Sequence, residues 1–418
     1  MRNINRKVSA KSIFVWNIVG SMTRAGSSVI LLLIVTRICG TSDGGVFSIA
    51  YATAQMLLTI GWYGMRAYQV TDVRSRFQFS TYLSSRVITC LIMLLGGGIY
   101  IAVSRYSAEK AWVVFFICVL KMVDAVEDVY HGLLQQHGRL DLAGILLTVR
   151  NVFSMFSFFV VLLATRNLLI TSAIVSIVSL FFCLLLNIPF ANQLERSTFN
   201  FSFLPLKKLF IDCFPLCAGN FLSIYIYNAP KYAIDNSLSA DFQAYYNIIF
   251  MPAFVINLFS EVVFKPLLVK LASLWIDGDV KQFFSMIFRL IVWIILLTVI
   301  AVISAYFIGI PVLSILYGVD LSGFKLELLI LLSGGGFGAC AWLLNNVLTA
   351  MRKQKILLLG YSLVAIFAGI LSPVLVSKLH FRGAALSYFW SILLLSGFFM
   401  ASLLFYKLRN RKNEEEQI

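Results

Sequence analysis

The stretch IFVWNIVGSMTRAGSSVILLLIV, Ile13–Val35, decides the fold of this 418-residue chain. It is apolar apart from Arg24 and small polar residues, and it exceeds the roughly 20 residues that span a bilayer. A charge at the centre of a membrane helix costs at least about 2.5–3.5 kcal/mol, so such residues usually face a water-filled interior. Polar residues recur at steps of four, three and four, which places them on one helix face: Asn17, Ser21, Arg24 and Ser28.

Composition places the chain among polytopic membrane proteins. Hydrophobic residues make up 60%, charged residues 13%, and the mean hydropathy is +0.88, whereas soluble domains carry about 25% charged residues. The first apolar stretch is too long for a signal peptide, so we interpret it as a spanning helix. The seven cysteines lack metal-site spacing, and no phosphate-binding loop is present. We expect an all-α transporter without a metal or cofactor.

Twelve apolar segments follow one another, and an internal repeat divides them into two six-helix halves. The repeat links VTRICGTSDGGVFSI (35–49) with AIDNSLSADFQAYYN (233–247). We therefore predict an N-terminal half over 1–190, a cytoplasmic connector over 191–209 and a C-terminal half over 210–418. The segments are 13–37, 45–65, 81–104, 111–134, 143–165, 168–190, 210–235, 243–264, 286–308, 326–350, 356–376 and 383–406.

The distribution of positive charge predicts the orientation. Lys and Arg residues in the connecting loops and tails fall 23 to 6 on the side that holds both termini. Because cytoplasmic loops are enriched in these residues, both termini are expected in the cytoplasm. The net charge of +15 is thereby explained by membrane topology, and no nucleic-acid partner is expected.

The fourth segment carries an unusual polar stripe. Its residues follow at steps of three and four, with Glu127 beside them: Lys121, Asp124, Asp128, His131 and Gln135. Two readings stay open, a structural ladder of salt bridges and a functional face with a proton relay at the histidine. A buried ion pair contributes little stability, which favours function.

The seventh segment is the second candidate. Its polar residues again share a face and surround a proline that should kink or break the helix: Asn220, Tyr227, Lys231 and Asp235, with Pro230. Broken helices near polar residues are where transporters build sites. The alternative is that the lysine and the last aspartate simply pair with each other. Pro252 should bend the eighth segment in the same way.

Three stretches resemble a known family. GLLQQHGRLDLAGILL (132–147), LTAMRKQKILLLGYS (348–362) and FRGAALSYFWS (381–391) look like the polysaccharide (Wzx-type) flippase branch of the multidrug/oligosaccharidyl-lipid/polysaccharide (MOP) exporter superfamily. The resemblance implies a V-shaped bundle of 12 helices with a basic central cavity. It implies that the chain flips a polyprenyl-pyrophosphate-linked saccharide, such as an O-antigen or capsule unit, across the inner membrane. The multidrug branch tends to carry an acid in its first helix, where this chain has Arg24.

The expected cavity combines these features. Because arginine binds phosphate bidentately, a pyrophosphate would meet the cations Arg24, Lys121, Arg150 and Lys231. Coupling to H⁺ or Na⁺ would use Asp124, Asp128, His131 and Asp235. The polar lining would be Asn17, Ser21, Ser28, Asn220 and Tyr227. Polysaccharide assembly proteins are possible partners. The alternatives are an ion-coupled multidrug antiporter and, less favoured, a membrane glycan polymerase or acyltransferase.

Overall fold

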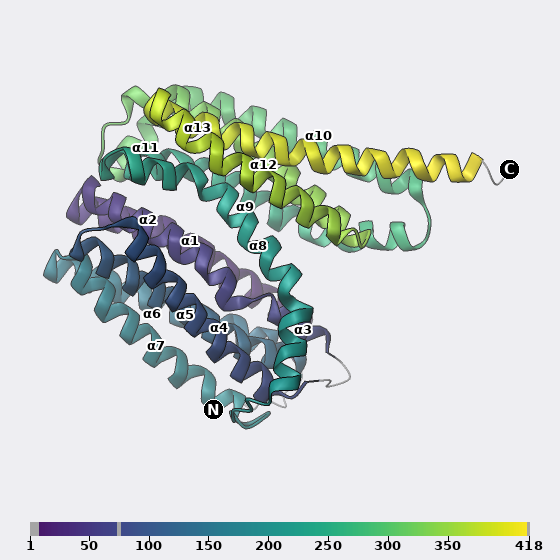
Figure 1. The fold of residues 1–418 in the computed structure, drawn as a ribbon, viewed down its shortest axis with the longest axis horizontal. Coiled ribbons are helices and arrows are strands. Elements are labelled where there is room, and N and C mark those ends of the chain that lie inside the picture. Colours follow the sequence, from purple (N-terminus) through teal and green to yellow (C-terminus); the bar gives the residue numbers. More distant parts are fainter. Residues whose placement is uncertain (1–7, 73–76, 416–418) are drawn as a thin grey trace. The chain divides into compact units, whose positions relative to one another are not determined.

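The computed structural model describes residues 8–72 and 77–415 and contains helices but no strand within them (Figure 1). The chain divides into two compact units, Met1–Phe221 and Leu222–Ile418. Nearly every described residue between the loops is helical, as expected for a chain whose backbone polar groups must be satisfied inside a bilayer. The all-α prediction is confirmed.

The N-terminal unit contains seven complete helices and the start of an eighth. These are α1 (Ala10–Cys39), α2 (Thr41–Trp62), α3 (Met65–Thr71), α4 (Phe79–Ser104), α5 (Ala108–Gln136), α6 (Leu140–Thr165), α7 (Leu168–Ala191) and the first part of α8 (Phe203–Ser237). Helix α5 is central, because it packs against α2, α3, α4, α6 and α7, while α1 packs mainly on α6.

The C-terminal unit is arranged around α12 (Lys325–Ala350), which packs against α9, α10 and α13. A π-helical turn, Ala305–Gly309, joins α10 to α11, so the two form one continuous rod. The long α13 is two helices, because His380 has non-helical backbone angles (φ 49°, ψ −127°). The remaining elements are α9 (Ala240–Ile276), α10 (Val280–Ser304), α11 (Ile310–Tyr317), the 3-10 turn Ser322–Phe324 and α13 (Gln354–Glu415).

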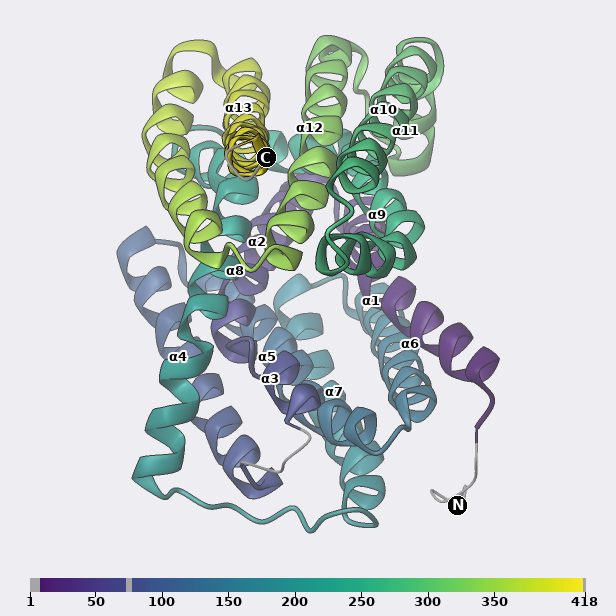
Figure 2. The same cartoon turned by 90° about the vertical axis from the view of Figure 1, so that its right-hand side faces the viewer.

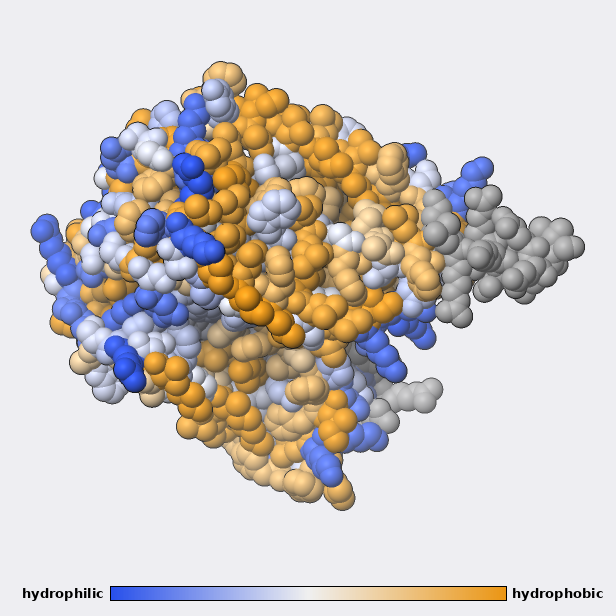
Figure 3. Space-filling view, turned by 45° about the horizontal axis from the view of Figure 1, so that its top comes forward, coloured by the Kyte–Doolittle hydropathy of each residue, from blue (hydrophilic) through white to orange (hydrophobic). Residues whose placement is uncertain are grey.

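The helices match the twelve predicted segments, and the chain is a multi-pass membrane protein. In the described ranges, nine helices are long and apolar enough to cross a bilayer, with α13 counted once. Helix α5, with its polar stripe, is not among the nine. Figure 3 shows hydrophobic residues over much of the face drawn, and many large apolar side chains are exposed on the long helices. Such surfaces fit a lipid environment rather than water.

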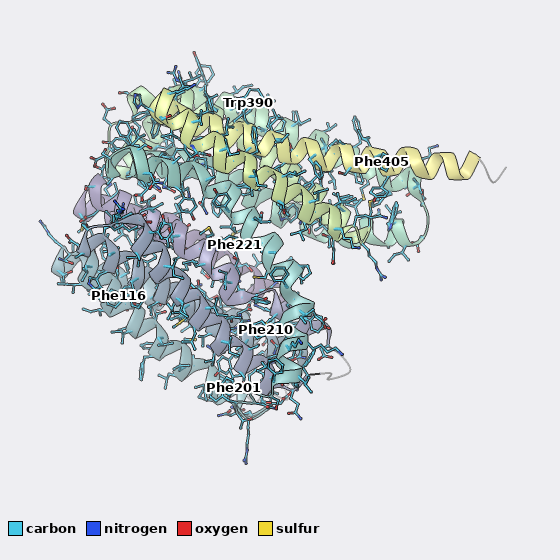
Figure 4. All side chains as sticks on the ribbon, in the orientation of Figure 1. Phe116, Phe201, Phe210, Phe221, Trp390 and Phe405 are labelled. Atoms are coloured by element: carbon cyan, nitrogen blue, oxygen red, sulfur yellow. The ribbon has the colours of Figure 1, made fainter. Side chains whose placement is uncertain are left out.

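The unit boundary falls inside α8 and not in the predicted connector. The start of α8 packs on the N-terminal unit, where the Phe210 ring lies edge-on to Tyr63 at 5.1 Å (Figure 4). Tyr68 donates a hydrogen bond of 2.8 Å to Asp212. In Figure 2 the same part of α8 runs beside α4 and α3. The connecting loop is also shorter than predicted, because α8 already begins at Phe203.

The helix break expected as one outcome at Pro230 does not occur. Helix α8 continues through Pro230, and α9 continues through Pro252. A proline removes only one backbone hydrogen bond from the helix, and membrane helices tolerate this where other groups satisfy the freed carbonyl. Polar side chains on α8 therefore sit on an unbroken helix.

The glycine run of α12 allows close helix packing. A Cβ atom on Gly335 would lie 2.9 Å from the Ala253 Cβ on α9, and one on Gly336 would lie 2.4 Å from the Thr298 hydroxyl on α10. On its other side, Gly334 faces the Tyr388 ring of α13. Small residues at membrane helix contacts let backbones approach.

Candidate functional site

Arg24 lies on α1, half-buried, and faces an aromatic ring. Its guanidinium carbon is 5.5 Å from the centre of the Trp62 ring at the end of α2. Among the described residues, no carboxylate pairs with this arginine. The charge is held by a cation–π contact, which neutralises none of it.

Lys231 has matching surroundings in the C-terminal unit. It lies on α8, half-buried, with its Nζ 5.2 Å from the centre of the Phe250 ring on α9. No ion pair of Lys231 is found within the described ranges. Asp235 itself is half-buried near the end of α8 and has contacts of its own.

The other predicted lining residues differ in exposure. Ser21 and Asn220 are exposed, while Asn17, Ser28 and Tyr227 are half-buried. The Tyr227 ring centre is 6.1 Å from that of Tyr388. By the division of the chain, Asn220 belongs to the N-terminal unit, although the remaining polar residues of its stripe belong to the other.

Lys121 and Arg150, the other two predicted cations, are tied into a buried network. Asp124 accepts a hydrogen bond of 3.0 Å from the Lys121 Nζ and a short one from Arg150. Lys121 also lies 4.4 Å above the Tyr51 ring. The exposed fractions are 5% for Lys121, 4% for Asp124 and 1% for Arg150. These two cations already have an ion-pair partner, in contrast to Arg24 and Lys231, for which none is found in the described part of the chain.

Glu127 is the second partner of Arg150. Its Oε2 accepts a bond of 3.0 Å from the Arg150 Nε, while the Ser179 hydroxyl on α7 accepts one of 3.2 Å from the same guanidinium. The other carboxylate oxygen, Oε1, lies 3.7 Å from the His131 Nε2. That distance is too long for a hydrogen bond. Glu127, which the sequence placed only beside the stripe, thus links α5 to α6.

Asp128 binds two further arginines that the sequence analysis counted with the cytoplasmic loops. It accepts bonds of 3.2 Å from Arg66 on α3 and 3.1 Å from Arg86 on α4. Arg86 is only 2% exposed and also donates to the Gly61 carbonyl. Gln135 accepts a bond of 3.0 Å from Arg66. Arg86 could have been recognised, because it lies inside the apolar segment 81–104, as Arg24 lies inside the first.

The stripe on α5 is therefore buried by neighbouring helices. Its partners come from α3, α4 and α6, so the ion pairs join helices and do not form only a ladder along α5. Between them, Arg66, Arg86, Lys121 and Arg150 balance the three carboxylates with one positive charge in excess. Within the described ranges, no group of three His, Cys, Asp or Glu side chains is arranged to hold a metal ion.

Comparison with known proteins places this geometry in context. No protein-family model matches the chain. The capsular polysaccharide biosynthesis protein CapF of Staphylococcus aureus is 22% identical over 380 residues, covering 90% of this chain and 93% of that protein. Among solved structures, an inward-facing multidrug resistance MATE transporter of the MOP superfamily is similar with a TM-score of 0.70, 11% identity and coverage of 96% and 99%.

The lipid II flippase MurJ in an inward closed conformation is similar with a TM-score of 0.68 and 14% identity, covering 92% of this chain and 87% of the flippase. At such identities the two solved structures establish the fold. The likeness to CapF extends over nearly the whole chain. The resemblance to the MOP superfamily is confirmed: the chain has the fold of that superfamily's membrane transporters.

Proposed function

We propose that the chain is a flippase that moves a polyprenyl-pyrophosphate-linked saccharide from the inner to the outer leaflet of the cytoplasmic membrane by alternating access. The saccharide would be an O-antigen, capsule or similar repeat unit on an undecaprenyl-type lipid. The likeness to CapF over 90% of the chain supports a role in polysaccharide assembly. The two predicted halves would move against each other, with both termini cytoplasmic.

The observation that carries the proposal is a pair of cations that form no ion pair with any carboxylate in the described ranges. Arg24 on α1 lies 5.5 Å from the Trp62 ring, and Lys231 on α8 lies 5.2 Å from the Phe250 ring. In each case the first helix of a half supplies the cation and the second helix supplies the ring. Among the described residues neither cation forms an ion pair, although Asp124 lies within electrostatic range of Arg24, so each has hydrogen-bonding capacity for an anionic ligand such as pyrophosphate.

Lys121 and Arg150 contribute to substrate binding indirectly in this proposal. Both are bonded to Asp124, and Arg150 also to Glu127. With Arg66, Arg86 and Asp128 included, the network on α5 carries one net positive charge, which adds to the potential around Arg24. The predicted coupling groups on this helix, Asp124 and Asp128, already have cationic partners in this conformation.

The test measures uptake of a labelled lipid-linked saccharide into inside-out vesicles. Arg24→Ala and Lys231→Ala should each lower uptake at least tenfold, because one charge-assisted pairing with a phosphate is worth about 1.5–3 kcal/mol. Arg24→Lys should recover only part, because the bidentate fork is lost. Matched controls are Lys11→Ala on α1 and Lys207→Ala on α8, which are exposed cations and should leave uptake unchanged.

The same vesicles separate the alternatives. A multidrug antiporter would accumulate a cationic dye, and removing the two cations would raise rather than lower that accumulation. Uptake of the saccharide should need an H⁺ or Na⁺ gradient, because moving one charge across 100 mV supplies about 2.3 kcal/mol. Uptake that persists without either gradient would instead identify a passive scramblase.

A further inference from the structure

A groove lies between α9 and α10 in the C-terminal unit. It has a volume of about 500 Å³ and is lined almost wholly by apolar side chains. Phe264 and Leu290, each less than 5% exposed, form its floor, and Leu267, Met286 and Leu297 also line it. The volume falls within the roughly 300–1,000 Å³ of small-molecule sites.

Two cations lie at one end of the groove. Lys270 comes shortly before the end of α9, and Arg289 shortly after the start of α10. Because a short turn at 277–279 joins these antiparallel helices, both side chains lie toward the same end of the hairpin. Both are exposed, and among the described residues neither has a carboxylate partner. As far as the described side chains show, two positive charges without an ion-pair partner therefore lie at this end of the groove.

The apolar part extends away from that end. Trp293, which is 52% exposed, lines the groove one turn beyond Arg289. Leu297 lies a further turn away, so the apolar length is about 12 Å at about 1.5 Å per helical residue. An indole at the boundary between charged and apolar groups is typical of the headgroup level of a membrane.

We propose that this groove binds a membrane phospholipid with an anionic headgroup, such as phosphatidylglycerol. One acyl chain would lie along the apolar floor, and the phosphate would lie between Lys270 and Arg289. Basic pockets between membrane helices bind anionic headgroups in this way, and guanidinium pairs with phosphate through two hydrogen bonds. The site shares no residue with Arg24 or Lys231, and it stands whether or not the proposed transport activity is correct.

The experiment follows the fluorescence of Trp293 in the full chain in detergent micelles. Phosphatidylglycerol brominated on its acyl chains should quench this indole, and subtracting the spectrum of Trp293→Phe isolates the signal. Brominated phosphatidylcholine should quench at least tenfold less effectively. Each cation near an anionic lipid contributes about fivefold, so Lys270→Gln with Arg289→Gln should weaken phosphatidylglycerol binding about 25-fold.

Two further variants make the result specific. Lys281→Gln removes an exposed cation from α10 outside the groove and should leave quenching unchanged. Met286→Phe narrows the groove without removing charge and should reduce quenching by both lipids. Equal quenching by the two brominated lipids, or quenching by a brominated polyprenyl phosphate but not by phosphatidylglycerol, would overturn the proposal.

Discussion

The fourth spanning helix occupies the centre of each unit, yet α5 and α12 are built from opposite chemistry. In α5 the central residues are charged and pair with side chains from α3, α4 and α6. In α12 the corresponding stretch contains Gly334, Gly335, Gly336 and Gly338, which approach α9, α10 and α13 closely. One position in a repeated fold is thus held by ion pairs in one half and by close packing in the other.

This difference separates the cations by role. Arg150 has two buried carboxylate partners, and Lys121 has one. Arg24 and Lys231 each lie beside an aromatic ring, and within the described ranges neither forms an ion pair. Removing one member of a buried ion pair strongly lowers the stability of the protein. A charge inside the membrane without an ion-pair partner instead lowers stability by being there. Under the proposed function, ligand binding would explain the second kind, and helix assembly would explain the first.

The largest effect is expected from breaking the network on α5. Arg150→Leu leaves Asp124 and Glu127 buried with fewer partners, and removing one member of a buried ion pair costs about 3–5 kcal/mol. Thermal unfolding in detergent should therefore shift strongly downward. Lys231→Leu, which removes a half-buried cation without a carboxylate partner among the described residues, should leave the transition unchanged or raise it. If both variants lowered the unfolding temperature by similar amounts, the distinction between the cation of the N-terminal unit and that of the C-terminal unit would be lost.

An intermediate effect is expected from disturbing the glycine contact on α12. A Cβ atom on Gly335 would lie 2.9 Å from the Ala253 Cβ and 3.0 Å from its Cα, so Gly335→Ala forces the helices apart. Overpacking of this kind costs about 1–3 kcal/mol.

Gly98 on α4 is the matched control, because a Cβ atom there would meet nothing within 4 Å. Gly98→Ala should be neutral or stabilise by about 0.4–1 kcal/mol through the unfolded chain. The comparison is read from the unfolding midpoints of the two variants in the same detergent. If the unfolding midpoint of Gly335→Ala were no lower than that of Gly98→Ala, close packing at Gly335 would not contribute to the stability of α12.

The sequence predicted the helices well because membrane spans are set by length and hydropathy alone. The twelve predicted segments agree with the helices of the structure. The ion-pair partners of the charged residues were harder to predict from the sequence. Steps of three and four showed which residues of α5 share a face, but not that Arg66 and Arg86 would meet Asp128 from other helices. Such contacts depend on helix packing, which one helix's periodicity does not contain.

The smallest effect is expected at Lys121. It tests whether Asp124 depends mainly on Lys121 or on Arg150 as its ion-pair partner. Lys121 shares Asp124 with Arg150, so Lys121→Met leaves that carboxylate paired. The loss should be about 1 kcal/mol, typical of one hydrogen bond, and smaller than for Arg150→Leu. The Tyr51 ring, 4.4 Å from the Lys121 Nζ, accommodates the apolar methionine. A loss as large as that of Arg150→Leu would mean that Asp124 depends on the lysine rather than on the arginine, and Arg150 would then be the more available of the two for an anionic ligand.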